Sequence, residues 1–123
     1  MESRKKILVV DDSSTNVLLL EAVLLEKGHL IYTATTVKDA WISIEKDLPD
    51  LIILDLLMPK VNGYDLLLKL RSETKTKDIP VIIVSAVTEP EDIKRARSFG
   101  HIVDFIQKPV DIQQIYDLVD TVF

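Results

Sequence analysis

The sequence predicts a three-layered α/β/α domain in which helices cover both faces of a five-stranded parallel sheet. Short apolar runs alternate along the chain with longer amphipathic segments, as strands and helices do in a parallel sheet. The chain has 123 residues, a length typical of one domain with its own core. With 47% hydrophobic and 28% charged residues, its composition is that of a globular protein rather than a disordered one.

The first strand and helix are the most clearly marked elements. Residues 7–10 are a continuous apolar run, which a strand covered on both faces requires. Residues 13–16 (Ser-Ser-Thr-Asn) offer side chains that cap a helix N-terminus, and Gly28 is a residue type that commonly follows a helix end. We therefore expect a strand at 7–10 and a helix that ends near residue 27.

The other four units follow the same pattern. Ala40 and Ile44 recur at helical spacing, the segment 58–63 reads as a turn, Gly100 follows the fourth helix, and Asp111 can cap the fifth. The remaining expected strands are 30–34, 51–54, 80–84 and 102–106. The remaining expected helices are 37–46, a third that starts at 64, 91–99, and a last one that reaches 123.

Strict alternation of strands and helices limits the topology. The crossovers between parallel strands must be right-handed, and five strands fit the flavodoxin-like order 2-1-3-4-5. Polar residues follow the first, third, fourth and fifth strands where each strand ends. Because ligands bind at the carboxyl edge of an open α/β sheet, we expect the functional site there.

Five side chains at this edge can form a phosphoryl-binding site. The expected strand order makes the first and third strands neighbours, which brings Asp11, Asp12 and Asp55 together. Three close carboxylates repel one another unless a cation neutralises them, and oxygen ligands of this kind suit Mg²⁺. Ser85 and Lys108 end the next two strands and can bind phosphoryl oxygens. The residues therefore predict a carboxylate nucleophile that accepts a phosphoryl group in the presence of Mg²⁺.

These residues and their neighbours resemble the receiver domain of two-component response regulators, of which the chemotaxis receivers are an example. The resemblance covers essentially the whole chain, so residues 1–123 are expected to form one receiver domain. The order of the motifs and their positions at strand ends are more specific than any single motif. The residues that carry the resemblance are Asp11-Asp12, Asp55 with Met58-Pro59 and Gly63, Ser85-Ala86, and Lys108-Pro109.

The resemblance implies a role for each residue of the phosphoryl site. Asp55 would be the phosphoacceptor, Ser85 and Lys108 would each bind a phosphoryl oxygen, and Phe105 occupies the position of the aromatic switch residue. Ser85 would take part in the same switch. The surface read by partners would be the fourth helix, the last strand and the fifth helix.

The resemblance also implies the metal ligands. Asp12 would bind Mg²⁺ directly together with Asp55, Asp11 would act mostly through a water molecule, and the backbone carbonyl of Leu57 would be the third protein ligand. The bond between Lys108 and Pro109 would be cis and would orient the lysine.

The expected partners are a sensor histidine kinase or a histidine phosphotransfer protein, and an effector domain or a second copy at the switch surface. The first helix is apolar around most of its circumference, although a helix on a sheet needs one apolar stripe. We expect Leu19, Leu20, Val23 and Leu24 to face the core. Val17, Leu18 and Leu25 would then form a docking surface for the helical bundle of a kinase.

Composition excludes several other classes. The chain lacks cysteine, which excludes disulfides, thiol catalysis and zinc–thiolate sites. A net charge of −5 argues against direct binding of nucleic acid, and no apolar run is long enough to span a membrane. Without a secretory signal, the cytoplasm is the expected location.

Three alternatives remain open from the residues alone. A phosphatase of the haloacid dehalogenase type needs an acid two residues after its nucleophile, where this chain has Leu57. A flavin site needs a phosphate-binding loop in place of Asp11 and Asp12. A degenerate receiver that only docks would not need its site residues, all of which are present. We therefore expect a signalling phosphoacceptor that catalyses only its own phosphorylation and slow autodephosphorylation.

Overall fold

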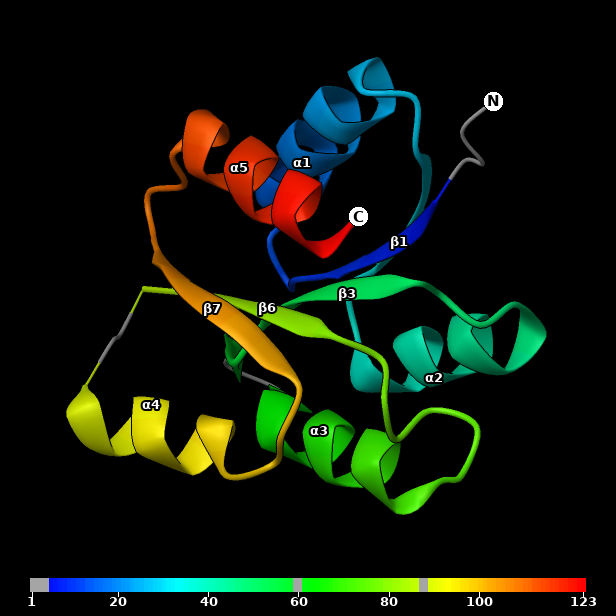
Figure 1. Cartoon of the computed structure of the whole chain (residues 1–123), viewed down its shortest axis with the longest axis vertical. Coiled ribbons are helices and arrows are strands. Elements are labelled where there is room, and N and C mark those ends of the chain that lie inside the picture. The colour runs from blue at the N-terminus through cyan, green and yellow to red at the C-terminus, as the bar shows by residue number, and fades with distance from the viewer. Residues whose placement is uncertain (1–4, 59–60, 87–88) are drawn as a thin grey trace.

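The computed structural model describes residues 5–58, 61–86 and 89–123. A five-stranded sheet in the order β2-β1-β3-β6-β7 forms its centre, and every pair in it is parallel (Figure 1). This is the predicted order, with the first, third, fourth and fifth long strands labelled β1, β3, β6 and β7. The strands are β1 (Lys6–Val10), β2 (Leu30–Ala34), β3 (Leu51–Asp55), β6 (Val81–Ser85) and β7 (Ile102–Gln107).

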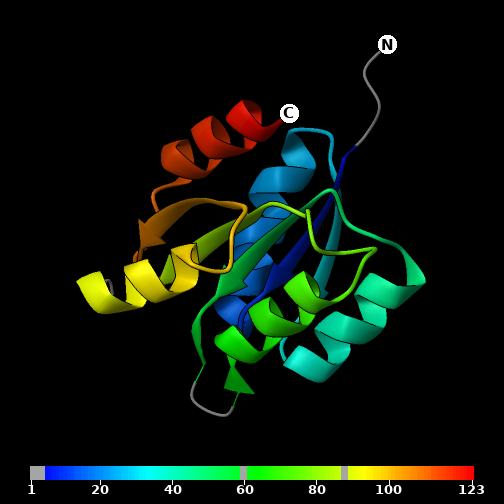
Figure 2. The ribbon, with the colours of Figure 1, turned by 60° about the horizontal axis from the view of Figure 1, so that its bottom comes forward.

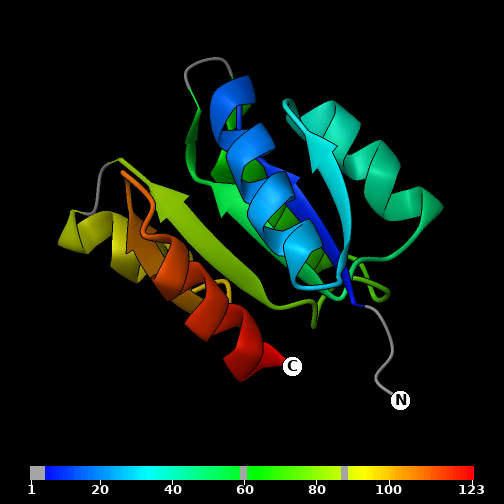
Figure 3. The same ribbon diagram turned by 90° about the horizontal axis from the view of Figure 1, so that it is seen from above.

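Five helices cover the two faces of the sheet. Figures 1 and 3 show α1 and α5 side by side on one face, with α2, α3 and α4 on the other. The helices are α1 (Ser14–Glu26), α2 (Val37–Lys46), α3 (Gly63–Ser72), α4 (Pro90–Arg97) and α5 (Ile112–Val122). The predicted three-layered architecture is therefore confirmed. None of the helices within the described ranges combines the length and the hydropathy needed to cross a membrane.

Local signals in the sequence fix where several helices begin and end. The Ser13 side chain accepts a hydrogen bond from the backbone N–H of Asn16, and the Asp111 side chain accepts from the first turn of α5. Gly28 follows α1 with a φ of +87°, a conformation that glycine adopts without strain. These three features were all predicted from the sequence.

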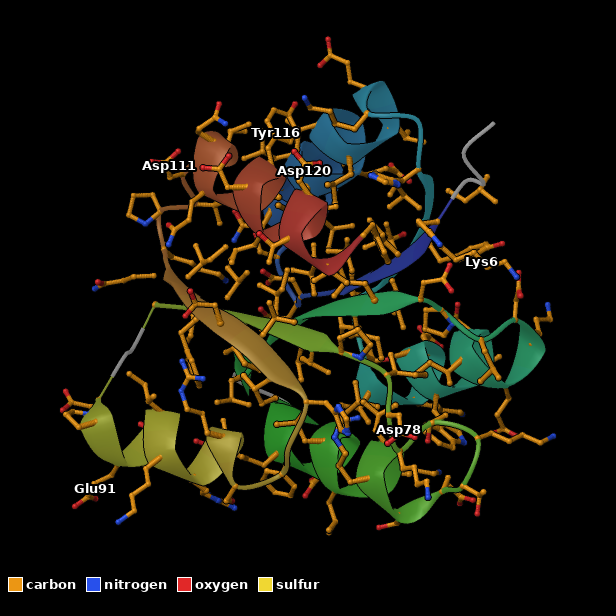
Figure 4. All side chains as sticks on the ribbon, viewed as in Figure 1. Lys6, Asp78, Glu91, Asp111, Tyr116 and Asp120 are labelled. Atoms are coloured by element: carbon orange, nitrogen blue, oxygen red, sulfur yellow. The ribbon has the colours of Figure 1, made fainter. Side chains whose placement is uncertain are left out.

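The sheet separates two apolar clusters, because successive strand residues point to opposite faces. Ile7 and Val9 of β1 pack with α1 and α5, whereas Leu8 and Val10 pack with the three helices of the other face. On the first face, Tyr116 of α5 donates a hydrogen bond to the backbone carbonyl of Val23 in α1 at 3.2 Å (Figure 4). This bond joins the two helices on that face.

The structure corrects the predicted burial of α1. Val17 was expected on the docking surface, but it is 7% exposed and packs in the core, whereas Leu19 was expected in the core and is 42% exposed. Leu20 and Leu24 are buried and Val23 is partly buried, as predicted. A helix with apolar residues on every side gives no periodic signal, so the sequence pattern could not identify the face that meets the sheet.

A short hairpin lies between β3 and α3, where the sequence predicted only a turn. Two-residue strands β4 (Leu57–Met58) and β5 (Val61–Asn62) pair in antiparallel fashion (Figure 2). Gly63 follows at once, and its N–H donates to the carbonyl of Leu56 at 3.1 Å. Strands of two residues are too short to show alternation, which explains why the pattern did not reveal them.

Arg71 joins two turns at the amino edge of the sheet, which is the edge opposite the predicted site. Its Nε donates to the carbonyl of Gly100 at 3.0 Å, just before β7. Its Nη1 donates to the carbonyl of Lys77 at 3.2 Å, in the segment that leads into β6. One side chain therefore fastens the entries to two adjacent strands.

Candidate functional site

The predicted site residues lie together at the carboxyl edge of the sheet. Asp11 directly follows β1 and Asp55 ends β3, and the two strands are neighbours in which Val10 pairs with Leu54. Ser85 ends β6, the next strand across. The sequence predicted that these strand ends would meet. The parallel pairing brings them to one edge of the sheet, although they are far apart in the chain.

Three carboxylates form the centre of this edge. One oxygen from each of Asp11, Asp12 and Asp55 lies within 4.8 Å of the others. Asp11 and Asp55 are 2% and 4% exposed, whereas Asp12 is open to solvent. Buried carboxylates this close need a counter-charge, and an oxygen-only donor set with one open side suits Mg²⁺, which keeps several water ligands. The cluster therefore fits Mg²⁺, the ion that the resemblance implied.

Lys108 supplies a positive charge inside the cluster. Its Nζ lies 3.0 Å from Asp11 Oδ2 and 3.0 Å from Asp55 Oδ2. Burial lowers the pKa of the Lys108 ammonium, but the hydrogen bonds to Asp11 and Asp55 outweigh this effect and raise the pKa above its usual value. Lys108 is therefore charged at neutral pH and can bind oxygens of either a carboxylate or a phosphoryl group.

Asp11 is held by two further contacts that the sequence analysis did not identify. The N–H of Ser13 donates to its Oδ1 at 2.9 Å, and Asn16 Nδ2 lies 3.5 Å from its Oδ2. Asn16 belongs to the first turn of α1. A polar residue one turn into the helix that follows an acid pair is the signal that could have indicated this contact.

Ser85 and Lys108 are joined through the backbone. The N–H of Lys108 donates to the carbonyl of Ser85 at 2.9 Å, and the bond between Lys108 and Pro109 is cis, as the resemblance implied. Ser85 is 2% exposed. The two residues expected to bind phosphoryl oxygens therefore lie on adjoining segments beside Asp55.

Phe105 lies farther from the acids than these residues. It is the partner of Ile83 across β6 and β7, whereas Ser85 pairs with Gln107. Its ring is partly buried against the apolar cluster of the α3 and α4 face. The guanidinium carbon of Arg97 in α4 lies 5.2 Å from the ring centroid. The Phe105 side chain therefore extends from β7 toward α4, so it can link the sheet to that helix.

One predicted site residue is described only by its backbone. The backbone of Leu57 belongs to β4, directly after Leu56, but its side chain lies outside the described part of the chain. Val87, two residues after Ser85 in the sequence, lies wholly outside the described residues.

The predicted docking surface on α1 is present in altered form. Leu18 and Leu25 are 63% and 51% exposed, as expected, and Leu19 takes the place of the buried Val17. We call the exposed residues Leu18, Leu19 and Leu25 the α1 leucine patch. The patch lies on the helix that begins beside Asp11 and Asp12.

Among models of protein families, that of the response regulator receiver domain matches residues 7–120 of this chain. The chain belongs to this family. It is 32% identical over 117 residues to protein PilH of Pseudomonas aeruginosa, which covers 95% of this chain and 96% of PilH. It is 38% identical over 106 residues to response regulator PleD of Caulobacter vibrioides, which covers 86% of this chain but 23% of PleD.

Solved structures agree with this assignment. The signal receiver domain of a signal transduction histidine kinase from Syntrophus aciditrophicus has a TM-score of 0.84 and 32% identity, covering 96% of this chain and 89% of that one. The chemotaxis protein CheY4 of Vibrio cholerae has a TM-score of 0.91 and 24% identity, covering 98% and 100%. At that identity the second likeness supports the fold alone. The chain is therefore a receiver domain, a signalling module of two-component systems, and it spans about a quarter of the length of PleD.

Proposed function

We propose that Asp55 of this receiver domain accepts a phosphoryl group from the phosphohistidine of a sensor histidine kinase or of a histidine phosphotransfer protein. The observation that supports this most directly is the position of Lys108 Nζ, 3.0 Å from both Asp55 and Asp11 in the acidic cluster. Such a lysine neutralises part of the cluster and stands beside the oxygen that would attack phosphorus.

In the proposed reaction, a carboxylate oxygen of Asp55 forms a bond to phosphorus while the bond between phosphorus and the histidine nitrogen breaks. The imidazole leaves with the electron pair of that bond. Lys108 would exchange a carboxylate partner for a phosphoryl oxygen, and the Ser85 hydroxyl would donate to another. These two donors would stabilise the charge of the transferred group in a largely buried site.

Asp11, Asp12, Asp55 and the backbone carbonyl of Leu57 would hold Mg²⁺ in this reaction. When bound, the ion would neutralise the carboxylates and bind an oxygen of the phosphoryl group. The fit rests on the three carboxylate oxygens within 4.8 Å of one another. Asp11, with Ser13 and Asn16 as further partners, would keep its orientation when Lys108 turns toward the phosphoryl group.

Incubation with radiolabelled acetyl phosphate tests the proposal. The wild type should incorporate label only with Mg²⁺, and Asp55→Asn should abolish incorporation because an amide is not a nucleophile. Asp65→Asn, at an exposed aspartate in the first turn of α3, is the matched control and should label normally. Equal labelling of Asp55→Asn and wild type, or labelling without metal, would overturn the assignment.

We further propose that phosphorylation acts on the surface formed by α4, β7 and α5. The Ser85 hydroxyl would move toward the phosphoryl group, and Phe105 would then prefer an inward rotamer. An effector domain or a second copy of the chain would read the changed surface. NMR spectra should show shifts at residues 91–118 on phosphorylation, and shifts confined to the surroundings of Asp55 would contradict this proposal.

We also propose a long-lived phosphoaspartate. The two positions that often carry water-orienting polar side chains in receivers are Leu57 and Val87 here. Loss of one water-orienting hydrogen bond at about 1.4 kcal/mol slows hydrolysis about tenfold. With Mg²⁺ present, the phosphorylated wild type should lose its label more slowly than Leu57→Asn or Val87→Glu, and an equal or faster loss would refute the idea.

A further inference from the structure

Two arginine side chains of helix α4 lie over aromatic rings, one of α3 and one of β7. Of the side chains described for α4, only that of Ala96 is buried. The guanidinium carbon of Arg95 lies 3.8 Å from the ring centroid of Tyr64 in α3, and that of Arg97 lies 5.2 Å from the ring of Phe105 in β7. Contacts of this kind are weak where solvent reaches them. The position of α4 therefore depends on a few specific contacts more than on burial.

Tyr64 makes the more extensive of the two contacts. Tyr64 is 4% exposed, and its hydroxyl donates to Asp92 Oδ1 at 3.0 Å and lies 3.3 Å from the backbone carbonyl of Asp92. Asp92 lies in the first turn of α4, and Arg95 follows one turn later. We call Tyr64, Asp92 and Arg95 the Tyr64 clasp.

The clasp is connected to Asp55 through a tightly packed backbone. Tyr64 follows Gly63, at which an added Cβ would lie 2.8 Å from Leu56 Cα and 2.9 Å from the carbonyl oxygen of Asp55. The Gly63 N–H also donates to the carbonyl of Leu56. Because these backbone segments are in close contact, we expect a shift of residues 55 and 56 to be transmitted to residues 63 and 64.

From this arrangement we propose that Tyr64 is a positioning residue that couples Asp55 to α4. Its hydroxyl holds the first turn of α4 while Asp55 carries no phosphoryl group, and release of this hold is part of the switch. The inference rests on the proposed function of Asp55. It gives Asp55 a second connection to α4, through α3, in addition to the proposed connection through Ser85 and Phe105.

The hydrogen bond from Tyr64 to Asp92 should not change in strength near neutral pH. Burial and the hydrogen bond to Asp92 raise the pKa of the Tyr64 phenol to about 12, so the hydroxyl remains a donor. Among the described residues, the charged groups in contact with it include Asp92 and Arg95 of α4. Phe99, whose ring centroid lies 6.3 Å from that of Tyr64, adds an uncharged neighbour.

Amide hydrogen exchange in the unphosphorylated protein tests the hold directly. Tyr64→Phe should increase exchange at residues 93–97 roughly three- to tenfold, because it removes one hydrogen bond from the contact that fixes α4. Tyr32→Phe is the matched control, since the Tyr32 hydroxyl bonds Asp47 at 2.9 Å and Tyr32 lies in β2, at the edge of the sheet opposite β7. Equal exchange at 93–97 in the two variants would overturn the proposal.

A second variant separates the clasp from a general loosening of α3. Asp92→Ala should produce the same increase in exchange at residues 93–97. The double variant with Tyr64→Phe should exchange little faster there than either single variant, because both changes remove the same hydrogen bond. Additive increases would show that the two side chains act independently and would overturn the clasp.

The coupling itself is tested by phosphorylation. With acetyl phosphate and Mg²⁺, Tyr64→Phe should label about two- to fivefold faster than wild type, because the hold opposes the phosphorylated conformation. Equal rates would overturn the coupling. If the wild type did not label at all, the proposed function would be overturned. The hydrogen-exchange experiment would still test the contact between Tyr64 and α4, because it uses no phosphoryl donor.

Discussion

Helices α1 and α4 both begin just after strands that end at the acidic site, yet different forces hold them. Helix α1 buries Val17, Leu20 and Leu24, and it also exposes the α1 leucine patch. Helix α4 buries Ala96 alone among its described side chains and carries acids in its first turn and bases in its last, as the helix dipole favours. Apolar burial fixes α1, whereas a few polar and stacking contacts hold α4. The difference suits the proposed roles of the two helices, which are recognition of the kinase by α1 and displacement of α4 in the switch.

The largest effect should come from removing the burial that fixes α1. Leu20→Ala, at a residue 1% exposed, should lower the free energy of unfolding by about 2–5 kcal/mol in a urea titration. Ile93→Ala, at a partly buried residue of α4, should cost about 1 kcal/mol or less because less apolar surface leaves water. Comparable losses in the two variants would show that α4 is fixed as firmly as α1.

Alkaline pH should weaken the contact that holds α4. Because folding raises the pKa of Tyr64 from 10.0 to about 12, the folded protein keeps a proton that the unfolded chain loses, and stability falls as pH rises between these values. The shift corresponds to about 2–3 kcal/mol of unfolding free energy. Urea titrations at several pH values should show a steeper alkaline loss in wild type than in Tyr64→Phe, and parallel curves would contradict the assignment.

A third experiment tests recognition by α1. Leu18→Glu should slow phosphoryl transfer from the cognate histidine kinase about tenfold, equivalent to about 1.4 kcal/mol, but leave labelling by acetyl phosphate unchanged. The matched control is Leu68→Glu in α3, on the opposite face, where Leu68 is 58% exposed. It should change neither rate. Equal slowing of Leu18→Glu with both donors would indicate damaged folding instead of lost docking.

The smallest effect on stability should come from the other arginine of α4. Arg97 lies 3.5 Å from Asp104 in an exposed ion pair and above the ring of Phe105. Arg97→Ala should lower the free energy of unfolding by about 1 kcal/mol or less. It should nevertheless broaden or shift the ring resonances of Phe105 in NMR spectra. Unchanged resonances would show that Arg97 does not restrain the ring.

Much of this molecule could be predicted from its sequence because the deciding signals are local. Apolar runs define the five long strands, and Ser13, Gly28 and Asp111 mark helix ends by hydrogen bonding or backbone freedom. Strand order then follows from alternation, and the grouping of Asp11 and Asp55 follows from strand order. These inferences need no knowledge of side-chain packing.

What could not be predicted depends on packing between distant segments. The burial of Val17 in place of Leu19 requires knowledge of how α1 lies on the sheet. The bond of Tyr64 to Asp92 spans 28 residues, and neither residue belongs to a motif that would indicate it. Asn16 was likewise counted only as a possible cap, although its amide lies near Asp11.

The bonds of Arg71 have a consequence for how the sheet can move. This side chain fastens the entries to β6 and β7 at the edge opposite the acids. The backbone ladder also joins these strands along their length, and at their carboxyl ends the N–H of Lys108 donates to the carbonyl of Ser85. With both ends held, β6 and β7 are expected to respond to a change at the site as one unit.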